Sequence, residues 1–200
     1  MSTETHDALA GLFRYPDIAG REVVLAAATT LRGVDADLDA ILEAFERMFR
    51  YRDAIDLEEL YTHTFDINPV CSLEVGWHLF GEDYSRGAFL VRMRELMRRV
   101  GVEETSELPD HLPQVLAVLG RIPADEASSL AREFALPAVD KTLCGLGDKN
   151  NEYRAVLDAV RSFLVRRYGE AVDGPHTGIV AGQPYDGCSS CPALEGDRHG

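Results

Sequence analysis

Apolar side chains recur at intervals of three and four residues along most of this chain, a spacing that places them on one face of an α-helix. The clearest series comprises Leu38, Ile41, Leu42, Phe45, Met48 and Phe49. Two further series span residues 89–100 and 153–168, and each is followed directly by a glycine, a common residue just beyond a helix end. No segment alternates apolar and polar residues as a half-buried strand would. The sequence therefore predicts an all-α fold.

Weaker helical patterns fill much of the remaining chain. They cover residues 6–14, 17–32, 56–66, 71–80 and 125–147. Pro137 interrupts the last of them, and because proline lacks the N–H of a helix interior, we expect a kink or a break there. The patterns predict a single helical bundle of eight or nine helices over residues 1–168.

Residues 169–200 differ in composition from the rest of the chain. They hold seven of the 17 glycines and three of the nine prolines, with only scattered apolar positions. Such a segment buries too little apolar surface to offset the entropy lost on ordering. We therefore expect residues 169–200 to form a flexible C-terminal tail.

The chain carries 34 acidic and 20 basic residues, a formal net charge of −14. This excess disfavours nucleic acid and anionic membranes as partners and favours a basic peptide. The polar, acidic N-terminus does not resemble a secretory signal, and no run approaches the roughly 20 apolar residues of a membrane span. We expect a cytoplasmic protein. Acids gather in residues 35–59 and arginines in residues 86–99, so we expect these two segments to pair.

The most distinctive segment is Glu107-Leu108-Pro109-Asp110-His111-Leu112-Pro113, which precedes an apolar helical run. Pro109 favours an extended approach, and Pro113 is tolerated in a first helical turn. Asp110 is placed to cap that helix, because its carboxylate can accept hydrogen bonds from first-turn N–H groups. The segment is expected to hold a carboxylate and an imidazole on a stiff loop.

The sequence contains no phosphate-binding glycine loop, no His-Glu-x-x-His zinc motif and no Gly-x-Ser-x-Gly nucleophile elbow. Asp110 and His111 have the chemistry to transfer protons. Adjacent residues on a helix point about 100° apart, however, so the pair would not converge on one atom unaided. An enzyme that uses this pair is therefore the least favoured interpretation of the sequence.

Four cysteines raise another alternative. Cys71 and Cys144 lie among apolar residues and are expected in the core. Cys188 and Cys191 form a C-x-x-C pair in the tail, where a local disulfide, or a metal completed by His176 and His199, would make the chain a redox or metal module. A structural zinc site usually has a second cysteine pair, which is missing, so we assign no metal.

Several aromatic residues precede the distinctive loop. Tyr61, Phe65, Trp77 and Phe80 fit either a buried core or a groove that receives an amphipathic helix. The sequence alone does not separate these two interpretations.

Three segments, taken in order, resemble the delta-subunit family of respiratory nitrate reductases, the NarJ branch of the NarJ/TorD/DmsD group. They are Tyr61-Thr62-His63-Thr64-Phe65-Asp66, Gly81-Glu82-Asp83-Tyr84-Ser85-Arg86-Gly87 and the 107–113 segment. The Leu-Pro-Asp-His-Leu-Pro element is the most specific of them. The resemblance runs from residue 40 or so to residue 168.

Members of that family are all-helical cytoplasmic chaperones for molybdenum enzymes. The resemblance implies an assembly factor with no cofactor and no catalytic activity of its own. It would bind the N-terminal segment of a catalytic subunit, most commonly that of nitrate reductase, until the molybdenum cofactor is inserted. Cofactor-delivery proteins are further candidate partners.

The resemblance and the aromatic pattern together name the candidate peptide-binding residues. They are Tyr61, Phe65, Asp66, Trp77, Arg86, Leu108, Pro109, Asp110, His111 and Pro113. Apolar side chains would receive one face of a peptide helix, and carboxylates would meet its basic residues.

Overall fold

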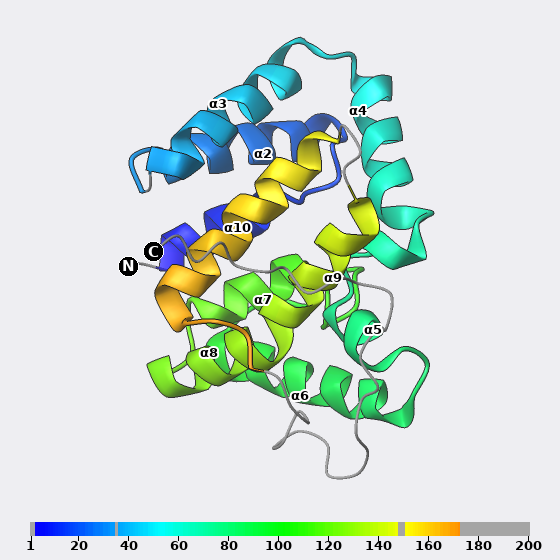
Figure 1. Cartoon of the computed structure of the whole chain (residues 1–200), viewed down its shortest axis with the longest axis vertical. Helices are drawn as coiled ribbons and strands as arrows, with labels where there is room; N and C mark the ends of the chain where they lie inside the picture. The colour runs from blue at the N-terminus through cyan, green and yellow to red at the C-terminus, as the bar shows by residue number, and fades with distance from the viewer. Residues whose placement is uncertain (1–2, 35, 148–150, 173–200) are drawn as a thin grey trace, which may run out of the picture.

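Helices account for most of the described chain, residues 3–34, 36–147 and 151–172, in the computed structural model of this protein (Figure 1). The α-helices are α1 (Thr3–Gly11), α2 (Ile18–Leu31), α3 (Ala36–Tyr51), α4 (Ala54–Tyr61), α5 (Val75–Phe80), α6 (Tyr84–Val100), α7 (Leu112–Leu119), α8 (Ala124–Leu130), α9 (Leu136–Leu146) and α10 (Glu152–Tyr168). Shorter turns are η1 (Thr62–Asp66), η2 (Pro69–Cys71) and η3 (Ala131–Ala135). Because η3 joins α8 to α9 without a break, the described residues form nine helical rods, and the all-α prediction is confirmed.

Side-chain caps explain where several helices begin. Asp17, Asp53, Asp83 and Asn151 each accept a hydrogen bond from a first-turn N–H, at 2.6 to 2.9 Å, at the start of α2, α4, α6 and α10. Such caps satisfy donors that have no acceptor within the helix. The helix ends expected near residues 100 and 168 are confirmed, since α6 and α10 end there.

Helix α10 crosses the middle of the bundle, with α2 and α3 on one side of it and α6, α7 and α8 on the other (Figure 1). One buried aromatic cluster lies where α3, α4 and α10 meet, and it contains Phe45, Phe49, Tyr61, Phe65 and Tyr153. A second contains Phe80, Phe89 and Phe134, with the rings of Phe89 and Phe134 stacked at 4.9 Å. The first cluster shows that Tyr61 and Phe65 belong to the core.

Helix α1 packs against α2 and α7 and is tied to distant parts of the chain. Asp7 forms an ion pair with Arg121, just after α7, with 2.5 Å between Oδ1 and Nη1. The Nε2 atom of His6 and the hydroxyl of Tyr168, the last residue of α10, form a buried hydrogen bond of 2.7 Å. The first helix is therefore held by the last one.

Pro137 does not break its helix. The expectation of a break at this residue is therefore wrong. The rod from α8 to α9 is continuous because η3 is a π-helical turn, in which the N–H of Leu136 reaches back to the carbonyl of Ala131. This wider turn places Pro137 at the start of α9, where its missing N–H is tolerated.

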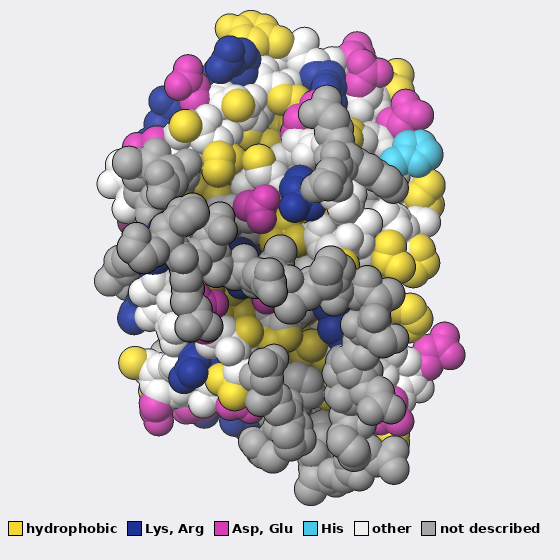
Figure 2. All heavy atoms as spheres, viewed as in Figure 1, with side chains coloured by type: hydrophobic (Ala, Val, Ile, Leu, Met, Phe, Trp, Pro, Cys, Tyr) yellow, Lys and Arg dark blue, Asp and Glu magenta, His cyan; other side chains and the backbone are white. Residues whose placement is uncertain are grey.

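The expected pairing of the acid-rich and arginine-rich segments is wrong. The arginines of α6 pair near their own helix instead: Arg94 with Glu104 at 2.9 Å and Arg99 with Glu126 at 2.6 Å. Glu46 on α3 pairs with its neighbour Arg50. Helices α3 and α6 lie at opposite ends of the molecule, so the two segments cannot meet (Figure 1). On the face seen in Figure 2, visible acidic and basic side chains are interspersed.

The cysteine predictions have mixed outcomes. Cys71 is buried as expected, whereas Cys144 is exposed on α9, so its predicted place in the core is wrong. Cys188 and Cys191, with nearly all of the predicted tail, lie outside the described residues. No helix in the described ranges is long and apolar enough to cross a bilayer.

Candidate functional site

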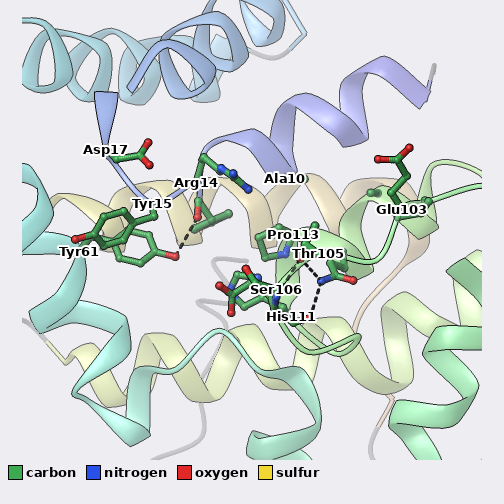
Figure 3. A pocket seen from close by; sticks show the side chains of 15 residues that line it. Ala10, Arg14, Tyr15, Asp17, Tyr61, Glu103, Thr105, Ser106, His111 and Pro113 are labelled. Carbon is green, nitrogen blue, oxygen red and sulfur yellow. Dashed lines mark hydrogen bonds between the residues drawn. The ribbon is translucent and has the colours of Figure 1, made fainter. Parts of the chain in front are cut away.

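A cavity of about 320 Å³ lies between the loop that follows α1, the end of α4 and the segment from residue 102 to α7. Its lining comprises Ala10, Phe13, Arg14, Tyr15, Asp17, Tyr61, Val102, Glu103, Thr105, Ser106, Glu107, His111, Pro113, Gln114 and Ala117. Figure 3 shows Tyr15 and Tyr61 on one side of it and Ser106, His111 and Pro113 on the other. Residues far apart in sequence therefore form one site.

The 107–113 loop is fixed by backbone hydrogen bonds to the segment before α5. The N–H of Leu112 donates to the carbonyl of Leu73 at 2.8 Å, and the N–H of Val75 donates to the carbonyl of Asp110 at 2.9 Å. Together they make a short antiparallel bridge between Glu74 and His111. These bonds fix the 107–113 loop against the segment that leads into α5.

The carboxylate of Asp110 is fully buried, with 0% of the residue exposed, and points to α5. Its Oδ2 accepts a hydrogen bond from the N–H of Gly76 at 3.0 Å, and Arg86 Nε lies 3.4 Å away. A Cβ on residue 76 would lie only 2.7 Å from Oδ2, so only glycine leaves room for this contact.

The prediction that Asp110 caps the helix following it is wrong. The N-cap of α7 is His111, and its side chain makes no capping hydrogen bond. The bridge to the residue 73–75 segment turns Asp110 toward the first turn of α5, so the carboxylate caps that helix instead. The placement of Pro113 in the first turn of α7 is confirmed.

Burial raises the pKa of Asp110, and the opposing effects of Arg86 and of the Gly76 N–H are smaller. The distance of 3.4 Å to Arg86 is longer than the usual 2.7–3.2 Å of an N–H···O bond. Oδ1 is also buried and has no hydrogen-bond partner among the described residues. The charged form of Asp110 is therefore incompletely compensated.

The raised pKa of Asp110 predicts a stability difference that depends on pH. The folded state binds this proton more readily than the unfolded state, so Asp110 contributes stability that is complete below the pKa of the unfolded chain and is lost as the pH rises through the folded pKa. We expect the wild-type chain to gain stability relative to an Asp110→Asn variant, which cannot titrate, between about pH 7 and about pH 4. Urea unfolding of both chains across this range measures the difference, and a constant difference would contradict the prediction.

His111 faces the cavity, unlike Asp110, which does not line it. Burial lowers the pKa of His111 to about 4, so its imidazole is neutral at pH 7. The two side chains diverge, as expected for adjacent residues at a helix start. The arrangement offers a neutral hydrogen-bonding ring in a cavity and no pair of groups converging on one atom.

Of the ten candidate residues, Tyr61, His111 and Pro113 line the cavity. Trp77 and Arg86 form a separate contact: the Arg86 guanidinium lies 5.6 Å from the centre of the Trp77 ring, whose Nε1 donates to the Pro69 carbonyl. The remaining candidates lie apart from the cavity: Phe65 and Pro109 are buried, Asp66 and Leu108 are exposed, and Asp110 caps α5.

Sequence reasoning missed several residues of the cavity lining. Arg14, Tyr15 and Asp17 belong to the loop between α1 and α2, and Gln114 belongs to α7. The only local signal was the Tyr15-Pro16-Asp17 turn with its helix cap, which says nothing about what the loop faces. The packing of α1 on α7 brings the two walls together.

Comparison with known proteins identifies the family of this chain. Residues 31–168 match the model of the family described as nitrate reductase delta subunit. The chain belongs to this family. Two matching relatives, from Escherichia coli strain K12 and E. coli O157:H7, bear the name nitrate reductase molybdenum cofactor assembly chaperone NarJ. Each is 30% identical over 167 residues, which cover 81% of this chain and 68% of the relative.

A solved structure supports the fold. A putative redox enzyme maturation protein from Archaeoglobus fulgidus superposes with a TM-score of 0.59 at 22% identity, covering 82% of this chain and 94% of that one. The predicted membership of the delta-subunit family is confirmed. The matched range contains Tyr61, His111 and Pro113 but not the loop between α1 and α2, so the family match covers only part of the cavity lining.

Proposed function

We propose that this delta-subunit family protein is a cytoplasmic assembly chaperone and not an enzyme. It binds the N-terminal segment of a molybdenum-enzyme catalytic subunit, that of a nitrate reductase or a relative, and holds it for cofactor insertion. The observation that carries the proposal is that three residues of the family-like segments, Tyr61, His111 and Pro113, line one cavity. The names of the E. coli relatives support the role.

The size and lining of the cavity suit an anchoring role. A volume of about 320 Å³ is at the small end of protein ligand sites, so it would hold one or two side chains of a peptide while the rest lies across the rim. Apolar contacts from Phe13 and Pro113 would anchor them. An affinity of 1 μM requires about 8 kcal/mol, which a few such anchors can supply.

The net charge of −14 supports a basic client segment, because long-range attraction raises the rate of encounter. The catalytic subunit is synthesised in the cytoplasm, so a chaperone for its N-terminal segment would meet it there.

Filling the cavity is expected to abolish client binding. Ala117 lines the cavity from α7, and an Ala117→Phe side chain would occupy the space proposed for the anchors. We expect the tagged full-length chain, purified from its own cells grown anaerobically, to retain a molybdenum-enzyme catalytic subunit through its N-terminus, and the Ala117→Phe chain to lose at least about 90% of it, a tenfold loss. Mass spectrometry of the bound protein gives the measurement.

Ala44→Phe is the matched control, because Ala44 is exposed on α3 and distant from the cavity lining. It should retain the client at the wild-type level. Recovery of no molybdenum-enzyme subunit by the wild-type chain would overturn the proposed function, and equal capture by Ala117→Phe would remove this cavity from it.

A further inference from the structure

Cys144, which is exposed on the surface of α9, is in a disulfide. The chain has four cysteines, and Cys71 is not in a disulfide. Cys71 is fully buried against α9, where its thiol donates to the carbonyl of Thr142 at 3.9 Å. Elimination leaves Cys188 and Cys191, which lie outside the described residues, as the candidate partners of Cys144.

The end of the described chain lies within reach of Cys144. The N–H of Val172 donates at 3.1 Å to the carbonyl of Arg132 in η3, which runs on into α9. Cys144 lies 12 residues beyond Arg132 in the same rod, a distance of about 18 Å at the 1.5 Å rise of a helix. The 16 residues that follow Val172, up to Cys188, span as much as about 50 Å when extended. The length of the chain therefore permits either cysteine to reach Cys144.

Cys188 and Cys191 have the C-x-x-C spacing, at which two cysteines can also form a disulfide with each other. When one of them is bonded to Cys144, the other remains as a tethered thiol close to that bond. Disulfides exchange when a thiolate attacks one of their two sulfurs. Cytosolic disulfides are usually transient or redox-sensing, so the cytoplasmic location proposed above favours a bond that exchanges over a permanent one.

We propose that Cys144 and the C-x-x-C pair form a thiol–disulfide switch that attaches the C-terminal segment to α9 and releases it. In the attached form, Cys144 is bonded to one cysteine of the pair. On release, the thiolate of the other cysteine attacks its neighbour's sulfur, a disulfide forms within the pair, and Cys144 leaves as a thiolate that takes up a proton. This exchange transfers no net electrons. Glutathione opens either disulfide to two thiols, and two glutathione molecules are then oxidised to one glutathione disulfide.

The test uses the full-length chain, equilibrated with mixtures of reduced and oxidised glutathione and then trapped with N-ethylmaleimide in urea. Trypsin places Cys144 in the peptide 142–149, both cysteines of the pair in the peptide 168–198 and Cys71 in the peptide 53–86. In oxidising mixtures, mass spectrometry should find 142–149 cross-linked to 168–198, with one maleimide on the remaining cysteine of the pair. An excess of reduced glutathione should remove this cross-link completely.

Cys144→Ser is the matched control, because the exposed position tolerates a polar side chain, and circular dichroism shows whether the variant is folded. It should give no cross-linked peptide, and its oxidised form should hold the disulfide within 168–198. The proposal is overturned if the oxidised wild-type chain holds only that local disulfide with Cys144 fully alkylated. A cross-link from 142–149 to 53–86, which would join Cys144 to Cys71, would overturn it as well.

Cys188→Ser and Cys191→Ser test the exchange step. The variant that keeps the cross-link has no second thiol in the pair, so only glutathione can open the bond. With reduced glutathione at about 0.1 mM, we expect the wild-type cross-link to open about tenfold faster than that of the variant, because a tethered thiol has an effective concentration of millimolar order. Equal rates would overturn the exchange step, and loss of the cross-link from both variants would overturn the assignment of the partner. The test involves no client, so its result is independent of the proposed function.

Discussion

Replacing Asp110 with alanine is expected to lower the free energy of unfolding by about 3 kcal/mol. The side chain is fully buried, and its Oδ2 is the acceptor for the Gly76 N–H at 3.0 Å and lies 3.4 Å from Arg86 Nε. Alanine leaves a buried N–H without an acceptor, a guanidinium without its counter-charge, and a cavity. Urea unfolding followed by circular dichroism at pH 7 measures the loss.

Asp110→Asn is the matched control. The amide oxygen can take the place of Oδ2 for both donors, and a neutral group suits a site that raises the pKa of the carboxyl. We expect this variant to stay within about 1 kcal/mol of the wild type. A loss as large as that of the alanine variant would show that the charge itself, and not the acceptor, holds α5 in place. The structure thus makes Asp110 a support for the loop that carries His111.

The second large effect is expected for Gly20→Ala, with a loss of about 3 kcal/mol. Alanine normally stabilises a helix relative to glycine by about 1 kcal/mol. At residue 20, however, the new Cβ would lie 1.8 Å from the carbonyl oxygen of Tyr15. Backbone has to move to relieve this overlap, and the backbone in question is the loop that lines the cavity. Chemical denaturation gives the stability, and the client-capture assay should show a parallel loss.

Gly87→Ala in α6 is the control for the general effect of alanine. A Cβ there would meet nothing within 4 Å, and the position is exposed. We expect a gain of up to about 1 kcal/mol. If both substitutions changed stability in the same direction and by the same amount, the close approach at Gly20 would have no energetic consequence.

The fold was largely predictable because long amphipathic helices leave a periodic record in the sequence. The series ending at residues 100 and 168 predicted two helix ends correctly. Pro137 misled because a π turn upstream, which has no sequence signature, absorbs it. Cys144 misled because apolar neighbours in sequence do not decide which face of α9 meets the core.

The candidate site was predictable only in part, because its lining comes from segments that lie far apart along the chain. The family-like segments identified Tyr61, His111 and Pro113, and these line the cavity. The role of Asp110 depended on a bridge to residues 73–75 that no local rule anticipates. The opposite wall, with Tyr15, lies about a hundred positions away from Gln114 in the sequence, and only the docking of α1 on α7 brings it near.

That docking has a consequence for the order of events during synthesis. One wall of the cavity leaves the ribosome first, but it has nothing to face until α7 has been made. The bond between His6 and Tyr168 closes the arrangement only when the end of α10 has emerged. Under the proposed function, a nascent chain would hold only half of the client site until then, and binding competence would arrive in a single late step of translation.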